Sequence, residues 1–201
     1  DLHRSAIDVY AEKILGPTDA SMPEEVDATG AEYYSSEDRI EWGHVVEPVA
    51  LARYGAKRGV AVEHFDRSLV STRYPWLGCT PAGWQQRGAS RAPVQVKTTG
   101  KPDLFDEGIP LRVQVQLQAE LLVTAAEMNT LVYVVLNEWD LGLGWIDVSR
   151  HAEFQALVLE ETEAFMRRVQ RREPPDPDGS RSAADALARL YSADETKAII
   201  L

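Results

Sequence analysis

Cysteine, long apolar runs and net positive charge are all scarce in this sequence. A single cysteine, Cys79, excludes an internal disulfide, fits a reducing cytoplasm, and is expected as a small buried strand residue rather than a nucleophile. No apolar run reaches the roughly eighteen residues that a membrane helix needs. The first residues also lack the charged start and apolar stretch of a secretion signal. These absences predict a soluble protein.

Basic residues are outnumbered, with 21 Lys and Arg against 32 Asp and Glu and a net charge of −11. This balance disfavours broad contact with nucleic acid, because phosphate groups are bound mainly by Lys and Arg. It still permits binding over a small area or inside a channel. The stretch from 87 to 112 is mildly basic, with Arg87, Arg91, Lys97, Lys101 and Arg112 against Asp103, Asp106 and Glu107. A plain solvated face explains that stretch equally well.

The length of 201 residues and the hydrophobic content of 44% fit one α/β domain spanning residues 1–201. Helical spacing of apolar residues predicts helices near 7–14, 42–58, 113–124, 154–172 and 182–191. β-rich segments predict strands near 59–65, 69–72, 77–80, 93–98, 130–136 and 142–148. This order predicts a central mixed β-sheet flanked by helices.

Several details follow from the same patterns. Residues 42–54 form one continuous apolar face, which Pro48 should kink. Segments 77–80 and 93–98 are expected to pair as a hairpin around Gly83 and Gly88. The acidic segment 18–38 predicts an exposed loop, and 174–201 a linker followed by a short helix.

Residues 94–98 carry the first chemical pattern. Side chains two apart on a strand share a face, so Gln95 and Lys97 should point one way and Val94, Val96 and Thr98 toward the core. An acid-x-Lys strand beside a carboxylate from a neighbouring strand is typical of nucleases that hold Mg²⁺ against a phosphate. There Lys97 would orient the attacking water and stabilise developing charge, unless a strongly lowered pKa made it a neutral base. Taken alone, the segment is far more typical of an ordinary amphipathic strand than of a nuclease site.

Two further patterns precede it in the chain. Glu47 lies one turn after Gly43, whose missing side chain leaves room beside the carboxylate, although a helix-edge Glu is usually just solvated. Residues 80–83 form a plain turn when taken alone. The three patterns in this order and spacing predict a metal-dependent nuclease site in which Glu47 is the only remaining carboxylate.

These patterns extend over most of the chain. Six segments of the chain resemble known motifs. In chain order they are an early helix at 7–13, G-x-x-x-E at 43–47, L-G-x-T-P-D-G at 77–84, P-x-E-V-K-T-T at 93–99, a Q-x-Q helix at 115–124 and a proline-rich C-terminal segment at 174–180. The same motifs, in the same order, occur in the YqaJ-type viral recombinase family of lambda-exonuclease-like phage alkaline exonucleases, which is part of the PD-(D/E)xK nuclease superfamily. The chain therefore resembles this family. The resemblance implies a restriction-endonuclease-like α/β core.

The resemblance also implies roles for particular residues. The implied catalytic residues are Lys97, Gln95, Glu47 and Gln116, the last on the following helix. The implied metal ligands are Glu47, Gln95, the backbone carbonyl of Val96, and position 82, where Ala82 replaces the family's Asp. The implied DNA contacts are Arg87, Arg91, Lys101 and Thr98. The expected ion is Mg²⁺ or Mn²⁺, held weakly or not at all in this chain.

The two non-acidic positions, 82 and 95, differ in their consequence for metal binding. An amide is tolerated at the position of Gln95 in some superfamily relatives, among them transposon-end nucleases and Mrr-type restriction enzymes. A methyl group at Ala82 cannot bind a metal, which indicates either an engineered trap or a natural loss of cleavage. The family's N-terminal Arg-containing helix and G-S/A-S/D segment have no counterpart, so a missing N-terminal segment with the 5′-phosphate site is expected.

Three functions remain open at this point. The first is a Mg²⁺-dependent 5′ to 3′ exonuclease on duplex DNA ends, inactivated by Ala82 and working with a single-strand annealing protein in recombination. The second is a non-catalytic DNA-end-binding recombination module, and the third is a Q-x-K endonuclease within a larger complex. The resemblance further implies a homo-oligomeric ring such as a trimer, no membrane contact, and a cytoplasmic phage or prophage protein of a bacterial host.

Overall fold

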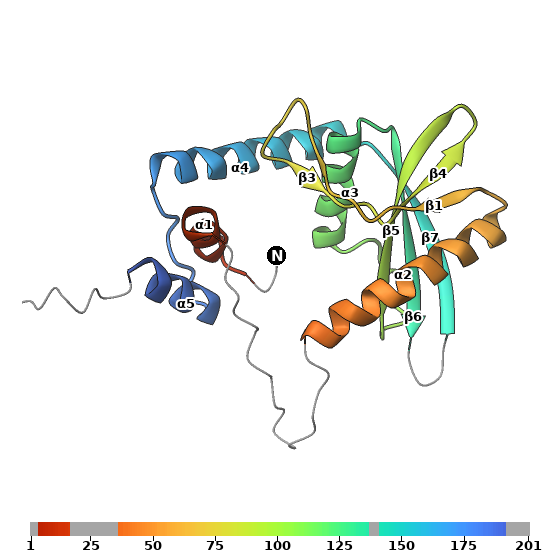
Figure 1. The fold of residues 1–201 in the computed structure, drawn as a ribbon, viewed down its shortest axis with the longest axis horizontal. Coiled ribbons are helices and arrows are strands. Elements are labelled where there is room, and N and C mark those ends of the chain that lie inside the picture. The colour runs from red at the N-terminus through yellow and green to blue at the C-terminus, as the bar shows by residue number, and fades with distance from the viewer. Residues whose placement is uncertain (1–3, 17–35, 137–140, 192–201) are drawn as a thin grey trace, which may run out of the picture. The chain divides into compact units, whose positions relative to one another are not determined.

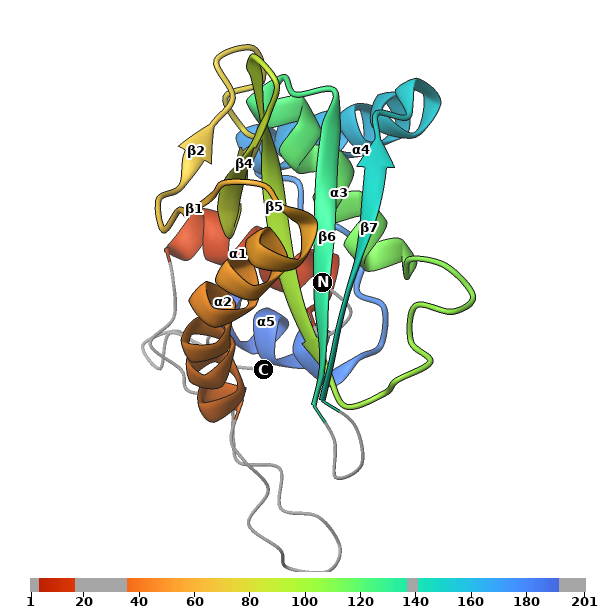
Figure 2. The ribbon, with the colours of Figure 1, turned by 90° about the vertical axis from the view of Figure 1, so that its right-hand side faces the viewer.

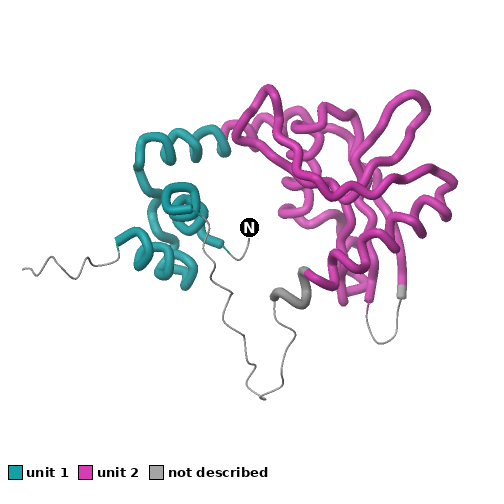
Figure 3. The backbone as a smooth tube through the Cα atoms, viewed as in Figure 1, with its two compact units in different colours: residues 1–20, 161–201 teal, residues 21–160 magenta. Residues whose placement is uncertain are grey.

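The computed structural model describes residues 4–16, 36–136 and 141–191. The chain divides into two compact units: unit 1 contains residues 1–20 and 161–201, and unit 2 contains residues 21–160 (Figure 3). The single domain over 1–201 stays a prediction. Of the loop expected at 18–38, residues 18–35 lie outside the described part of the chain, and residues 36–38 already belong to a helix.

Unit 2 is built around a five-stranded mixed sheet in the order β1-β4-β5-β6-β7 (Figure 1). Its strands are β1 Val62–His64, β4 Gly83–Arg87, β5 Ser90–Thr99, β6 Met128–Leu136 and β7 Leu141–Ser149. Strands β5 and β6 run parallel, whereas the other three neighbouring pairs are antiparallel. Two short strands, β2 Leu69–Val70 and β3 Gly78–Cys79, form a separate antiparallel pair. The predicted mixed α/β sheet is thereby confirmed.

Helices cover both faces of the sheet (Figure 2). On the first face, α2 Ser36–Arg58 buries Leu51 and Tyr54 against alternate residues of β5 and β6. On the second face, α3 Leu111–Thr124 buries Leu117 against Leu131 and Phe105. Since side chains alternate along a strand, β5 therefore presents one set of residues to α2 and the other set to α3.

Unit 1 contains α1 Ala6–Leu15, α5 Arg181–Leu190 and the last part of α4 Ala152–Arg171, whose first part belongs to unit 2. Small and apolar side chains pack α1 against α5, namely Ile7, Ala11, Ala183 and Ala186. The side chains of Ser5 and Ser180 cap the two helices by accepting backbone N–H groups of Asp8 and Ala183. The helix predicted near 182–191 is thereby confirmed.

The predicted strand pairing was wrong in one place. Of residues 93–98, Pro93 and Val94 pair with β4 and residues 94–98 run parallel to β6. None of them pairs with 77–80, because β3 pairs with β2. In the β4-β5 hairpin Arg87 lies opposite Ser90, and Gly88 turns the chain with a φ of +59°, a conformation that favours glycine. Strand β4 was not predicted, because its residues 85–87 are polar and do not show the apolar pattern of a strand.

The apolar face predicted along α2 is divided. Ala50 and Tyr54 lie in the core, but the side chains of Trp42, Val45 and Val49 are 60%, 54% and 63% exposed. Apolar spacing alone could not tell which part of the stripe meets the sheet. A Cβ added at Gly43 would meet no described atom within 4 Å, so closeness to Glu47 does not require this glycine.

Candidate active site

Strand β5 places two of the predicted site residues on the face that α3 covers. Gln95 and Lys97 lie beside Leu131 and Tyr133 of β6, which pack in the cluster around Leu117. Val94 and Val96 belong to the opposite cluster under α2. The predicted division of these side chains is confirmed, except that Thr98 is exposed near the strand end instead of facing the core.

Lys97 lies among charged groups from both flanking helices. Burial of its ammonium group lowers the pKa of Lys97, and the positive charge of Arg112 on α3 lowers it further. The carboxylates of Glu120 on α3 and Glu47 on α2 act in the opposite direction. The structure thus brings Lys97 within electrostatic reach of Glu47, as the sequence pattern predicted, and of Glu120, which the pattern missed.

Glu120 is a fully buried carboxyl, with 0% of its surface exposed. One oxygen accepts a hydrogen bond from the amide of Gln116 at 3.0 Å and the other from Asn129 at 2.7 Å. Burial raises the pKa of Glu120 to about 7, although both amide donors and the charge of Lys97 oppose this rise. The sequence did contain a signal for this residue. Glu120 follows Gln116 by four residues on the buried side of an apolar helix, and this spacing brings two helical side chains into contact.

Glu47 bonds to a histidine that the sequence analysis did not consider. Its Oε1 lies 3.2 Å from Nε2 of His64 on β1. Both side chains are partly exposed. This pairing ties the carboxylate of α2 to the edge strand of the sheet next to β4 and uses part of its capacity to bind other groups.

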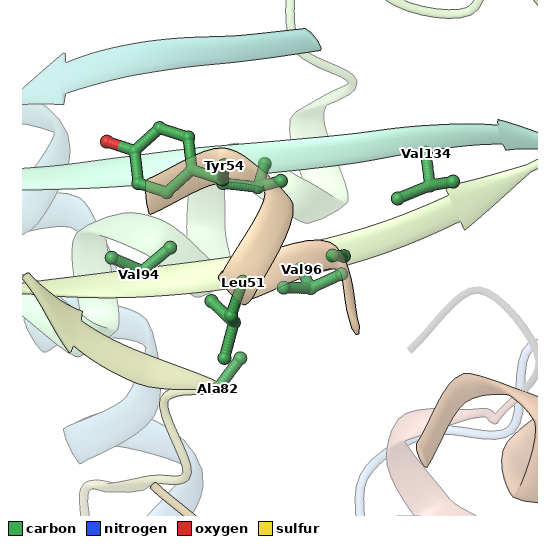
Figure 4. Close-up of a cluster of buried hydrophobic side chains, with 8 residues drawn as sticks. Leu51, Tyr54, Ala82, Val94, Val96 and Val134 are labelled. Carbon is green, nitrogen blue, oxygen red and sulfur yellow. The ribbon is translucent and has the colours of Figure 1, made fainter. Parts of the chain in front are cut away.

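The implied metal ligands do not gather into an ordinary Mg²⁺ or Mn²⁺ site. Ala82 is 2% exposed and its methyl group belongs to the apolar cluster of Leu51, Val94 and Val96 (Figure 4). The amide of Gln95 is buried, donates to the Val96 carbonyl at 3.4 Å, and leaves its Oε1 without a partner. Within the described ranges no three His, Cys, Asp or Glu side chains come together as metal ligands. One free amide oxygen does not replace the carboxylates that such ions need.

Cys79 lies on β3, near Glu120. Burial, followed by the charge of Glu120, raises the pKa of the Cys79 thiol to about 12. Since the thiolate is the reactive form, a group that stays protonated near neutral pH is a poor nucleophile. The strand placement of Cys79 is confirmed, although the residue is only partly buried.

The residues expected to contact DNA differ in their surroundings. Arg87 forms an ion pair with Asp147 at 2.7 Å, and Arg91 pairs with Glu63. Lys101 is exposed just after β5. Two of the three cations thus have an acidic partner within the chain, and their contact with DNA stays a prediction.

The chain belongs to the family described as the YqaJ-like viral recombinase domain, whose model matches residues 3–127. This match confirms the resemblance found in the sequence motifs. A search of curated protein sequences found no match. The described helices include none that combines the length and apolar character required to cross a membrane.

Solved structures share the fold at low sequence identity. The alkaline exonuclease LHK-Exo from Laribacter hongkongensis superposes with a TM-score of 0.58 and 19% identity, over 86% of this chain and 90% of that one. Its complex with dAMP gives 0.55 and 17%, over 94% and 93%. A phage-related exonuclease from Haemophilus somnus 129PT gives 0.51 and 11%, over 84% and 94%. At such identities these similarities establish the fold alone.

Proposed function

We propose that this chain is an exonuclease domain of phage-type recombination in which Ala82 has replaced a carboxylate needed for cleavage, so that it binds duplex DNA ends without cutting them. The observation that carries this proposal is the surroundings of Lys97. Its ammonium lies partly buried within reach of Glu47 and Glu120, while position 82 holds a methyl group. Membership of the YqaJ-like family and the fold shared with two exonucleases support the proposal.

The residues present can bind a phosphate but lack the means to activate water. The ammonium of Lys97 can donate hydrogen bonds to an anionic phosphate oxygen. The free Oε1 of Gln95 can accept one bond from a water or cation. Because both oxygens of Glu120 already accept hydrogen bonds from amides, the described part of the site offers Glu47 alone as an anionic ligand for a divalent ion. We therefore derive no hydrolytic step for the chain as it stands.

The test restores the missing charge. Ala82→Asp should degrade linear duplex DNA when Mg²⁺ or Mn²⁺ is supplied, and EDTA should stop the reaction. Ala82→Asn is the matched control, because it has nearly the same size and no charge, and Lys97→Met in the Ala82→Asp background should remove the activity. An Ala82→Asp protein that folds and leaves linear DNA intact with either ion would refute a nuclease site at this position.

The second function is a binding module that never cleaves. It is favoured by the absence of acids at both position 82 and position 95. Here the unmodified chain should bind blunt and recessed duplex ends, with an affinity that falls as salt rises, and Ala82→Asp should add no cleavage. Failure to bind any duplex end would remove it.

The DNA substrate distinguishes the third function, a Q-x-K endonuclease, from the other two. Ala82→Asp should then cut closed circular DNA, whereas strict dependence on a free end excludes this function. The 5′ to 3′ direction, the annealing partner, the ring-shaped oligomer and the preference for Mg²⁺ remain predictions from family resemblance.

A further inference from the structure

The buried carboxyl of Glu120 has no assigned role in the sequence motifs, yet it lies on the side of the sheet to which Gln95 and Lys97 point. Its partner Asn129 lies on β6 two residues before Leu131, on the same face, and Leu131 is the register neighbour of Gln95. Glu120 also contributes to the electrostatic surroundings of Lys97. The carboxyl therefore faces the strand pair that carries Gln95 and Lys97.

Placing a carboxyl here is costly for the fold. A buried carboxylate loses its hydration, and exchange of buried charged groups for apolar side chains of similar volume is often neutral or stabilising. The neighbours on α3, Leu117 and Leu121, are fully buried, so an apolar residue would suit this part of the core. Two amide donors and a nearby ammonium compensate Glu120 instead, and two of these three partners, Asn129 and Lys97, come from strands outside the helix.

We propose that Glu120 is a positioning residue of the candidate site, which supplies the buried negative charge that Gln95 lacks. It acts through two groups, by holding the ammonium of Lys97 near β5 and by orienting the amide of Gln116 through their hydrogen bond. The catalytic part of this inference rests on the proposed function. The interaction between Glu120 and Lys97 is a property of the folded chain, so it can be tested without measuring DNA cleavage.

The first test measures coupling between the two charges. Urea unfolding midpoints at pH 8 are compared for the unmodified chain, Lys97→Met, Glu120→Gln and the double variant. Lys97→Met should lower the midpoint markedly in the presence of Glu120, and much less in the Glu120→Gln background, where no charge is left unpaired. Gln118→Ala serves as the control partner, because Gln118 on the same helix bonds to Gln155 and the Ser149 carbonyl. Additive midpoints for Lys97→Met and Glu120→Gln would overturn the proposal.

The second test measures catalysis in the Ala82→Asp background. Glu120→Gln should lower kcat at least about tenfold and leave the KM for linear duplex DNA unchanged, as expected for loss of an interaction made in the transition state. Adding Gln95→Glu should restore most of the loss, since it returns a negative charge to the same face. Gln114→Ala, at an exposed position of α3 whose amide donates to the Ile109 carbonyl, should leave kcat unchanged.

The outcomes separate the two proposals. An unchanged kcat in Glu120→Gln, or a loss that Gln95→Glu does not restore, makes Glu120 merely structural and overturns the inference. If Ala82→Asp itself has no activity, the proposed function fails, and the urea experiment alone decides whether Glu120 holds Lys97.

Discussion

The side chain at position 82 lies in a cluster with Leu51, Val94 and Val96, so any charge introduced there needs a compensating partner. Glu120 shows how the same molecule compensates a carboxyl elsewhere, with two amides and a nearby ammonium. The two buried positions therefore differ: position 82 holds a methyl group among apolar side chains, whereas position 120 holds a carboxyl with polar partners. Both can be tested by single substitutions.

Restoring Asp at position 82 should make stability depend on metal. In EDTA, Ala82→Asp should melt below the unmodified chain, because the new carboxylate is buried among apolar groups. A divalent ion at about a hundredfold excess over its Kd would add about 2.7 kcal/mol. For a chain of this length that corresponds to a rise in Tm of roughly 5–10 °C, measured by calorimetry with and without Mn²⁺. The unmodified chain and Ala82→Asn should show no such rise, and equal rises in all three proteins would contradict metal binding at this position.

Glu120 should make stability depend on pH. Its pKa in the fold is about 7 against an ordinary value of 4.5, so the folded state binds the proton more tightly. Its contribution to stability is fully present below about pH 4.5 and is lost as pH rises through about 7, a change on the order of 3 kcal/mol. Urea unfolding at pH 5 and pH 8 should therefore differ more for the unmodified chain than for Glu120→Gln. Identical pH dependence in the two proteins would contradict a raised pKa.

Among the elements of unit 2, four are tied together by one polar network. Asp147 on β7 accepts hydrogen bonds from Arg58 of α2, Arg87 of β4 and Thr130 of β6. These partners, Arg58 foremost, hold the pKa of Asp147 well below its usual range. The network also extends through Gln85, which links Thr130 to Tyr54. It thus fixes the end of α2 against three strands.

Breaking this network should destabilise the fold far more than breaking an exposed ion pair. Asp147→Asn removes the charge that pairs with two guanidinium groups and should lower the free energy of unfolding by about 2 kcal/mol. The control is Glu63→Gln, whose exposed pair with Arg91 should contribute less than about 1 kcal/mol. Chemical denaturation at neutral pH measures both, and equal losses would contradict the structural role of Asp147.

The helices and strands were largely predictable from the sequence, whereas the pairing of the strands and the burial of the site residues were not. Residues 130–136 and 142–148 show β-rich patterns, and β6 and β7 contain them. By contrast, β4 has a polar composition and is recognisable only through its pairing with β5. Glu120 was missed because burial of a carboxyl depends on contacts with Asn129, which comes from a different element. Such contacts leave no local pattern.

For the whole molecule, the net charge of −11 means that DNA has to be bound through a few unpaired cations. Arg87 already has Asp147 as its partner, whereas Lys101 is exposed beside the end of β5. Lys101→Gln should therefore reduce the slope of log K against log salt by about one. Arg87→Gln should leave the slope nearly unchanged and lower stability. Fluorescence anisotropy with a labelled duplex measures the slopes, and a larger effect of Arg87 than of Lys101 would contradict this assignment.

We propose that this YqaJ-like chain has a nuclease site that lacks one decisive carboxylate. The most direct measurement is the rate at which Ala82→Asp degrades linear duplex DNA with Mg²⁺, compared with the unmodified chain and Ala82→Asn. We predict degradation by Ala82→Asp alone, abolished by EDTA. A folded Ala82→Asp protein that is as inactive as the other two would contradict the account.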